Sequence, residues 1–183
     1  ISKISKNHVY LPLFQTHVTI LLSGLMVIII RHFLVDSENV NDNWLMLFDM
    51  ADETDEIIVF YTKKSPHMSY ISVIKLIEND QRKIKFEECF EGNNALDFQL
   101  ISYMGYLMGS DAAAKSNSSE IHEDNEYIVM SNDTGYDPVI QFWKKKGFSV
   151  KRINVNFCKL ALQKQKEVTY EVIEDPQPQD TVN

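Results

Sequence analysis

The chain has 183 residues, of which 44% are hydrophobic and 24% are charged, and its 18 Lys and Arg against 26 Asp and Glu give a formal net charge of −8. These values are typical of one soluble globular domain that buries a core without disulfides or structural metals, and they exclude disorder or internal repeats for most of the chain. The negative charge argues against a broad basic surface that wraps long nucleic acid, but it leaves room for an acidic site that needs metal cations.

The cysteines indicate a reducing compartment. Cys89 and Cys158 form no CxxC pattern and no Cys/His spacing, which argues against a zinc site and against a disulfide framework. We therefore expect two buried thiols and a cytoplasmic protein.

An apolar run, VTILLSGLMVIII, occupies residues 18–30 and outwardly resembles a signal peptide or a short membrane anchor. The run is shorter than the about 20 apolar residues that a bilayer core requires, and it continues into a predicted strand. We interpret residues 1–25 as an extension that the domain does not need, residues 26–158 as the domain, and residues 159–183 as a partly disordered tail. A membrane-targeting segment is the alternative for residues 1–25, although we expect no stable membrane span.

From residue 27 onward, the apolar pattern alternates between strand and helix. Short β-branched or apolar segments predict strands at residues 27–35, 56–62, 83–90, 126–130 and 148–155. Helical spacing predicts helices at residues 43–50, 65–80, 93–108 and 136–146. Residues 110–124 predict a loop after Gly109, and beyond Lys164 we expect at most a short strand and then an end without order.

This order predicts an α/β fold, a three-layer α/β/α sandwich with a mostly parallel sheet of about five strands. Acidic residues stand where two of the predicted strands end. Asp36 follows the first strand and Asp133 follows the fourth, with Asp137 at the start of the next helix and Asp97 one turn into the third helix. Because parallel sheets bind ligands outside the carboxyl ends of their strands, these acids form a candidate site.

A metal ion explains why such carboxylates would converge. Near a core they repel one another and are costly to bury, unless cations or hydrogen bonds compensate. Oxygen ligands favour Mg²⁺ or Mn²⁺ over zinc, and such ions stabilise charge on a phosphodiester. Each acid also has a structural explanation, since Asp36 could end a strand, Asp133 could form an Asx turn and Asp137 could begin a helix. Their common position at one edge of the sheet favours the metal site.

The segments LVDSENV, ALDFQL and YIVMSNDTGYDPVI, in this order, resemble the acidic motifs of PIN-like nucleases, especially the bacterial branch close to NYN domains. The resemblance covers about residues 27–155. It implies a PIN-like sandwich that holds Mg²⁺ or Mn²⁺ on carboxylates and cleaves RNA by metal-activated water. The residues that it assigns to catalysis and metal binding are Asp36, Asp97, Asp133 and Asp137. It also assigns substrate or water contacts to Asn39 and to Ser131 or Thr134.

Basic and aromatic residues after the second predicted strand are candidates for substrate contact. Lys63 and Lys64 follow that strand and are expected at the same edge as the acids, where they could bind phosphate, although exposed lysines are also ordinary surface residues. Tyr61, His67 and Tyr70 could stack on an unpaired base or simply pack.

The function that this pattern predicts is a metal-dependent ribonuclease, acting as an endoribonuclease on single-stranded or structured RNA. A catalytically inactive PIN-like module that binds RNA or a protein is the alternative, and a homo-oligomer or a regulatory protein could hold the substrate. A phosphotransfer domain with Asp36 as nucleophile is disfavoured, because the segment Cys89–Glu91 offers no aspartate after the third strand. No GxGxxG follows any strand, which argues against dinucleotide binding.

Overall fold

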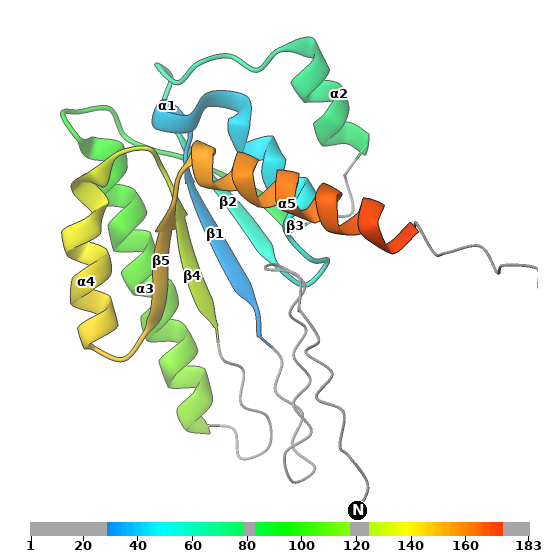
Figure 1. The fold of residues 1–183 in the computed structure, drawn as a ribbon. Coiled ribbons are helices and arrows are strands. Elements are labelled where there is room, and N and C mark those ends of the chain that lie inside the picture. Colours follow the sequence, from blue (N-terminus) through cyan, green and yellow to red (C-terminus); the bar gives the residue numbers. More distant parts are fainter. Residues whose placement is uncertain (1–28, 79–82, 118–124, 174–183) are drawn as a thin grey trace, which may run out of the picture.

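The computed structural model describes residues 29–78, 83–117 and 125–173 (Figure 1). Its centre is a five-stranded sheet in the order β3-β2-β1-β4-β5, in which every neighbouring pair is parallel. The strands are β1 (Arg31–Asp36), β2 (Glu56–Tyr61), β3 (Lys83–Glu88), β4 (Glu126–Met130) and β5 (Ser149–Ile153). The predicted α/β class and the parallel sheet of about five strands are therefore confirmed.

Helices follow the strands along the chain. After β1 come α1 (Ser37–Val40) and the 3₁₀ helix η1 (Asn41–Asp49), and after β2 comes α2 (Tyr70–Glu78). The remaining helices are α3 (Ala95–Asn117), the 3₁₀ helix η2 (Thr134–Tyr136), α4 (Asp137–Lys145) and α5 (Val155–Ile173). Gly147, with φ of 89°, adopts the left-handed conformation that commonly ends a helix, so α4 ends where the sequence predicted.

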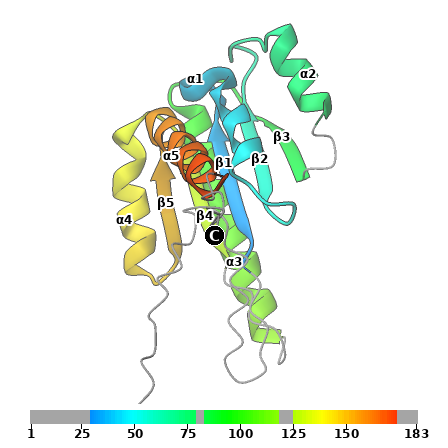
Figure 2. The same ribbon diagram turned by 45° about the vertical axis from the view of Figure 1, so that its right-hand side comes forward.

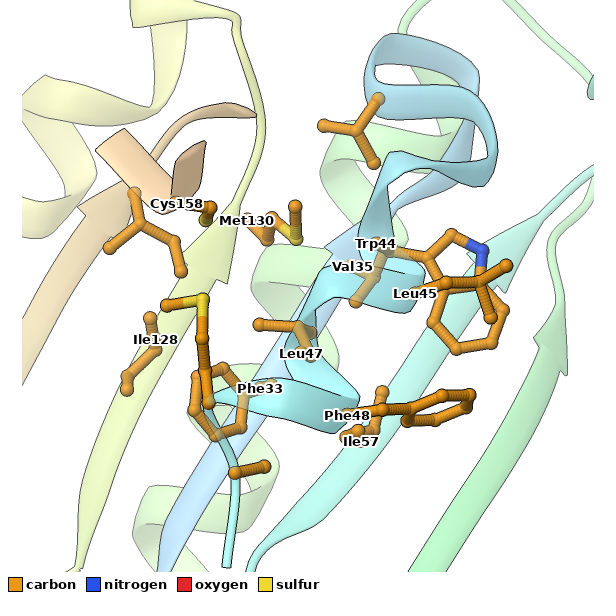
Figure 3. Close-up of a cluster of buried hydrophobic side chains, with 14 of the residues drawn as sticks. Phe33, Val35, Trp44, Leu45, Leu47, Phe48, Ile57, Ile128, Met130 and Cys158 are labelled. Atoms are coloured by element: carbon orange, nitrogen blue, oxygen red, sulfur yellow. The ribbon is translucent and has the colours of Figure 1, made fainter. Parts of the chain in front are cut away.

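Two hydrophobic clusters make the three layers, because successive strand residues point to opposite faces of the sheet. On one face, Phe33, Val35, Ile57 and Ile128 pack under η1 and the start of α5 (Figure 3). On the other face, which α3 and α4 cover (Figure 2), residues such as Leu34, Ile58 and Val129 form the second cluster. Cys158 belongs to the first cluster and Cys89 to the second, and both are buried free thiols, as expected. Burial raises the pKa of each thiol to about 11.

α3 is longer than the sequence predicted. It passes through Gly109 and ends at Asn117, so the predicted helix end at Met108 and the loop after it are wrong as far as residue 117. Alanine is the best helix former, and residues 112–114 are alanines. Asp111 just before them accepts hydrogen bonds from Asn125 and from Tyr127 of β4, which fixes this part of the helix against the sheet. Residues 118–124 lie outside the described residues.

α5 replaces the end of the fifth predicted strand and the strand expected beyond Lys164. β5 ends at Ile153, and the helix from Val155 to Ile173 buries Val155, Cys158 and Ala161, which are three residues apart on one face. The expectation of a short strand before residue 174 is therefore wrong. Residues 1–25 and 174–183 lie outside the described residues, and the division of the chain at residues 26 and 158 stays a prediction. No helix in the described ranges is long and apolar enough to cross a membrane.

α2 begins at Tyr70 and not at residue 65 or 66 as predicted. Ser69 caps it, since the Ser72 amide donates to the Ser69 Oγ at 3.1 Å. The Asp42 carboxylate, from η1, accepts from the Ser69 amide at 3.1 Å and from the Ser72 hydroxyl at 2.6 Å. Because the helix begins only at Tyr70, residues 62–69 form an irregular segment beside the carboxyl edge of the sheet.

Candidate active site

Asp36 is the last residue of β1, and it is 1% exposed. One of its carboxylate oxygens, Oδ1, accepts from the Asn39 amide at 3.2 Å and so caps α1. The other, Oδ2, accepts from the Ser131 hydroxyl at 2.9 Å, across the β1–β4 pair. The chain therefore positions this carboxylate from two directions.

Burial raises the pKa of Asp36, and the nearby Asp97 carboxylate raises it further, while the hydrogen bonds from Ser131 and Asn39 act in the opposite direction. Desolvation is the largest of these causes. A carboxylate in this position is held by neutral donors alone, so a cation that approached it would relieve the cost of its burial.

Tyr136 joins Asp36 to Asp97. Its hydroxyl donates to Asp97 Oδ1 at 2.6 Å and lies 3.4 Å from Asp36 Oδ2. The side chain is buried, and burial together with the two carboxylates raises the pKa of Tyr136, so the hydroxyl keeps its proton. Sequence reasoning missed this residue, although a tyrosine next to Asp137, inside the acidic motif, was a signal that could have marked it.

Asp133 lies in the loop after β4 and is exposed to solvent. Its Oδ1 accepts from the Gly135 amide at 2.7 Å, and its own amide donates to the Ser131 Oγ at 3.0 Å. Asp133 thus caps η2, which is the turn that the sequence also allowed for it. Ser131 holds both Asp36 and the Asp133 backbone, so the two aspartates are linked through one hydroxyl.

Asp36, Asp97 and Asp133 line one pocket at the carboxyl edge of the sheet, which we call the acidic pocket. They come from β1, α3 and the loop after β4, which are distant in sequence, as the positions of the predicted strand ends had suggested. The sequence-predicted substrate residues that also line it are Asn39 and Lys64. Glu38 and Glu91 line it too; the Thr62 hydroxyl donates to Glu38, and Lys64 pairs with Glu91 at 3.2 Å.

Four predicted residues do not line the acidic pocket. Ser131 is fully buried, and its hydroxyl contacts Asp36 and the Asp133 amide in place of a substrate. Thr134 does not line the acidic pocket, and Lys63 lines a neighbouring one. Asp137 does not line it either, because its two carboxylate oxygens accept from the Arg152 guanidinium at 2.7 and 3.1 Å. Those hydrogen bonds lower the pKa of Asp137. Arg152 also donates to the Ser131 carbonyl oxygen at 3.0 Å, so Asp137 is tied to the loop that carries Asp133.

The donor set suits a hard divalent cation only in part. Carboxylate oxygens are the ligands that Mg²⁺ and Mn²⁺ prefer, and Asp36 and Asp97 both approach the Tyr136 hydroxyl. However, within residues 29–78, 83–117 and 125–173, no three His, Cys, Asp or Glu side chains are grouped closely enough to hold a metal ion. Asp36 and Asp97 therefore fit a cation as a pair, with Asp133 at the wall of the same pocket.

Comparison with known proteins identifies the family of the chain. The sequence model of the PIN domain matches residues 30–153, the stretch from the start of β1 to the end of β5. Searches of curated proteins and of solved structures gave no match. PIN domains are generally nucleases and typically use divalent metals, and the five-stranded parallel sheet with its helices is consistent with their α/β/α fold. The match covers well over half of the chain, and the chain belongs to the PIN domain family.

Proposed function

We propose that this protein is a metal-dependent ribonuclease that hydrolyses phosphodiester bonds of RNA in the acidic pocket. The observation that carries the proposal is the convergence of Asp36, Asp97 and Asp133 on one pocket at the carboxyl edge of the sheet. Asp36 is buried there, and within the described residues it forms no ion pair with a Lys, Arg or His side chain. Because PIN domains are generally nucleases, metal-dependent hydrolysis of a phosphodiester is the function that best explains three carboxylates at one pocket.

Asp36 and Asp97 are the residues that would hold Mg²⁺ or Mn²⁺. When bound, such a cation neutralises charge on the phosphodiester and lowers the pKa of a water molecule. The chain supplies the rest of the arrangement: Ser131 orients Asp36, Tyr136 orients Asp97, and Lys64 and Asn39 line the wall where a phosphate would enter. Asp133, facing the same pocket, is proposed to orient water or to complete the cation's ligands. For Asp137, the Arg152 contact supports a role in positioning the Ser131–Asp133 loop.

An inactive PIN-like module that binds RNA or a protein is the second candidate. The observation that favours it is the Tyr136 hydroxyl, which lies between two of the proposed metal ligands. In this alternative, the hydrogen bond from Tyr136 stabilises the carboxylate pair in place of a cation.

Cleavage of labelled single-stranded RNA by the purified chain, in Mn²⁺, Mg²⁺ or EDTA, distinguishes the two candidates. We expect cleavage that requires a divalent cation and that falls by more than about 100-fold in Asp36→Asn and Asp133→Asn, because even residues behind the ligands commonly contribute 10–100-fold. Asp49→Asn is the matched control, since Asp49 is exposed and lies outside the acidic pocket. A folded parent that cleaves no RNA with either cation would contradict the ribonuclease and favour the binding module.

A further inference from the structure

A second pocket adjoins the acidic pocket and is lined largely by apolar and aromatic side chains. Its walls include Trp44, Tyr61 and Phe86, and Lys63 and His67 also line it. We call it the aromatic pocket. It shares Thr62 and Pro66 with the acidic pocket, so the two pockets lie on either side of the segment that follows β2.

The aromatic rings of this pocket are arranged edge to face. The Phe86 ring lies 6.0 Å from that of Trp44 and 6.4 Å from that of Tyr61, with interplanar angles of 78° and 75°. Trp44 is buried in the core, but Phe86 is 44% exposed on the edge strand β3. Phe86 is therefore the exposed ring of this group, and nucleobases stack on exposed aromatic rings regardless of their sequence.

The segment between the two pockets is basic and held in place. Lys63 lines the aromatic pocket, and Lys64 lines the acidic one. The turn is closed by hydrogen bonds from the Thr62 amide to the Ser65 Oγ at 2.9 Å and from the Ser65 amide to the Thr62 carbonyl at 3.0 Å. Lys63 forms no ion pair with any carboxylate in the described part of the chain. Its charge is therefore available to a phosphate that passes from one pocket to the other.

We infer that the aromatic pocket binds an unpaired nucleobase of the strand whose phosphodiester enters the acidic pocket, with Lys63 contacting the phosphate between them. This rests on the proposed function, and it adds a base-binding site beside the acidic pocket. A base in a duplex is stacked and paired, so it cannot enter a side pocket unless it is extruded, which costs a few kcal/mol. The pair of pockets thus selects single strands by shape, at a protein whose net charge of −8 gives little general attraction for nucleic acid.

The test is binding without cleavage. A short single-stranded RNA that contains one 2-aminopurine is titrated with the full chain in EDTA, and both its anisotropy and the quenching of the 2-aminopurine by stacking are recorded. The same sequence as single-stranded DNA and as a blunt RNA duplex forms the other two arms. We expect Phe86→Leu to weaken binding of the single strands by about fivefold or more, as for loss of one base stack, and to abolish most of the quenching. The duplex should bind at least tenfold more weakly.

Two variants make the result specific. Phe142→Leu is the matched control, because Phe142 is 52% exposed on α4 and lines neither pocket; its affinity should stay within twofold of the parent. Lys63→Met, an exposed substitution that leaves the core intact, should weaken single-strand binding and reduce its salt dependence by a slope of about 0.7, the value for one phosphate contact on a single strand.

The outcomes separate this inference from the proposed function. Binding and quenching that depend on Phe86, in a chain that never cleaves RNA, would support the base pocket and overturn the ribonuclease. Cleavage in Mn²⁺ together with unchanged binding by folded Phe86→Leu and Lys63→Met would overturn the base pocket and leave the ribonuclease standing. Equal binding of duplex and single strand, or no binding by the parent, would also overturn it.

Discussion

The two ends of β1 differ in whether a buried charge is compensated by an ion pair. The strand begins with Arg31 and His32 and ends with Asp36, and all three are at most 6% exposed. At the beginning, the Arg31 guanidinium pairs with Asp52 at 2.8 Å and with Asp55 at 2.5 Å. At the same end, the His32 Nδ1 lies 3.1 Å from a Glu56 oxygen.

At the carboxyl end, the charges have the same sign. Asp36 and Asp97 share the neighbourhood of one tyrosine hydroxyl, and neither forms an ion pair with a cation of the described chain. A buried ion pair is compensated within the chain, whereas a group of like charges without such compensation is a candidate functional site. We therefore propose that β1 has a structural end at Arg31 and a functional end at Asp36.

The largest effect is expected at the structural end, from Asp55→Asn. Asp55 is buried and accepts from both the side chain and the amide of Arg31, so its neutralisation leaves the guanidinium undercompensated. We expect the free energy of unfolding to fall by about 3 kcal/mol or more, as when one partner of a buried pair is removed. Urea denaturation measures it. Asp49→Asn is the control, and a loss no greater than in that exposed variant would contradict the assignment.

Tyr136→Phe should have the next largest effect. It removes a hydrogen bond to a carboxylate, so we expect a loss of about 2 kcal/mol in EDTA. The parent and the variant are then compared for the rise in Tm that Mn²⁺ causes, which should be larger in the variant because the two carboxylates lose the hydroxyl that stabilises them without a cation.

Tyr127→Phe gives the matched comparison at the opposite end. Tyr127 is also buried and donates its hydroxyl to an aspartate, Asp111, but it lies near the beginning of β1, stacked on His32. This variant should lose stability without changing the response to Mn²⁺. An equal response in both tyrosine variants would break the distinction between the two ends.

The smallest effect, and one of opposite sign, is expected for Asp36→Asn. An asparagine keeps an oxygen for the Asn39 amide and removes the buried charge, so Tm should rise by about 2–4 °C, or about 1 kcal/mol. The raised pKa of Asp36 means that its ionised form destabilises the fold above that pKa. The advantage of the variant should therefore be full at neutral pH and shrink as the pH falls through the pKa of folded Asp36 towards 3.8, the ordinary value. An advantage that is constant with pH, or a loss of stability, would contradict the assignment.

The strands were predictable because their signal is local. β2, β3 and β4 begin at the predicted residues. β2 and β4 are runs of buried β-branched and apolar residues, which leave few alternatives, whereas the edge strand β3 is mostly exposed and alternates charged residues with Ile84 and Phe86. α5 was not predictable from the same signal. Its buried residues, Val155, Cys158 and Ala161, include no large side chain, and they follow directly on the apolar pattern of β5. The helix is defined by packing against η1 and the sheet, which a local pattern does not contain.

The candidate site was predictable at the ends of strands and less so beyond them. Asp36 and Asp133 follow from the rule that parallel strands bring their carboxyl ends together, and Asp97 from its place near an apolar stripe. The partner of Asp137 was out of reach, because Arg152 lies on β5 and only the β4–β5 pairing brings it to Asp137. Tyr136 was missed for a similar reason, since its two contacts, Asp36 and Asp97, come from other elements.

The order of the strands in the sheet also has a consequence during synthesis of the chain. β4 is made after β1, β2 and β3, but it inserts beside β1, and the Ser131–Asp36 hydrogen bond joins residues 95 positions apart. Since a growing chain folds from its N-terminus as it emerges, Asp36 lacks its β4 partner while most of the sheet is being made. The acidic pocket is therefore completed late in translation, after Asp133 has left the ribosome. Until then, the nascent chain near the ribosomal RNA lacks one of the three aspartates of the pocket.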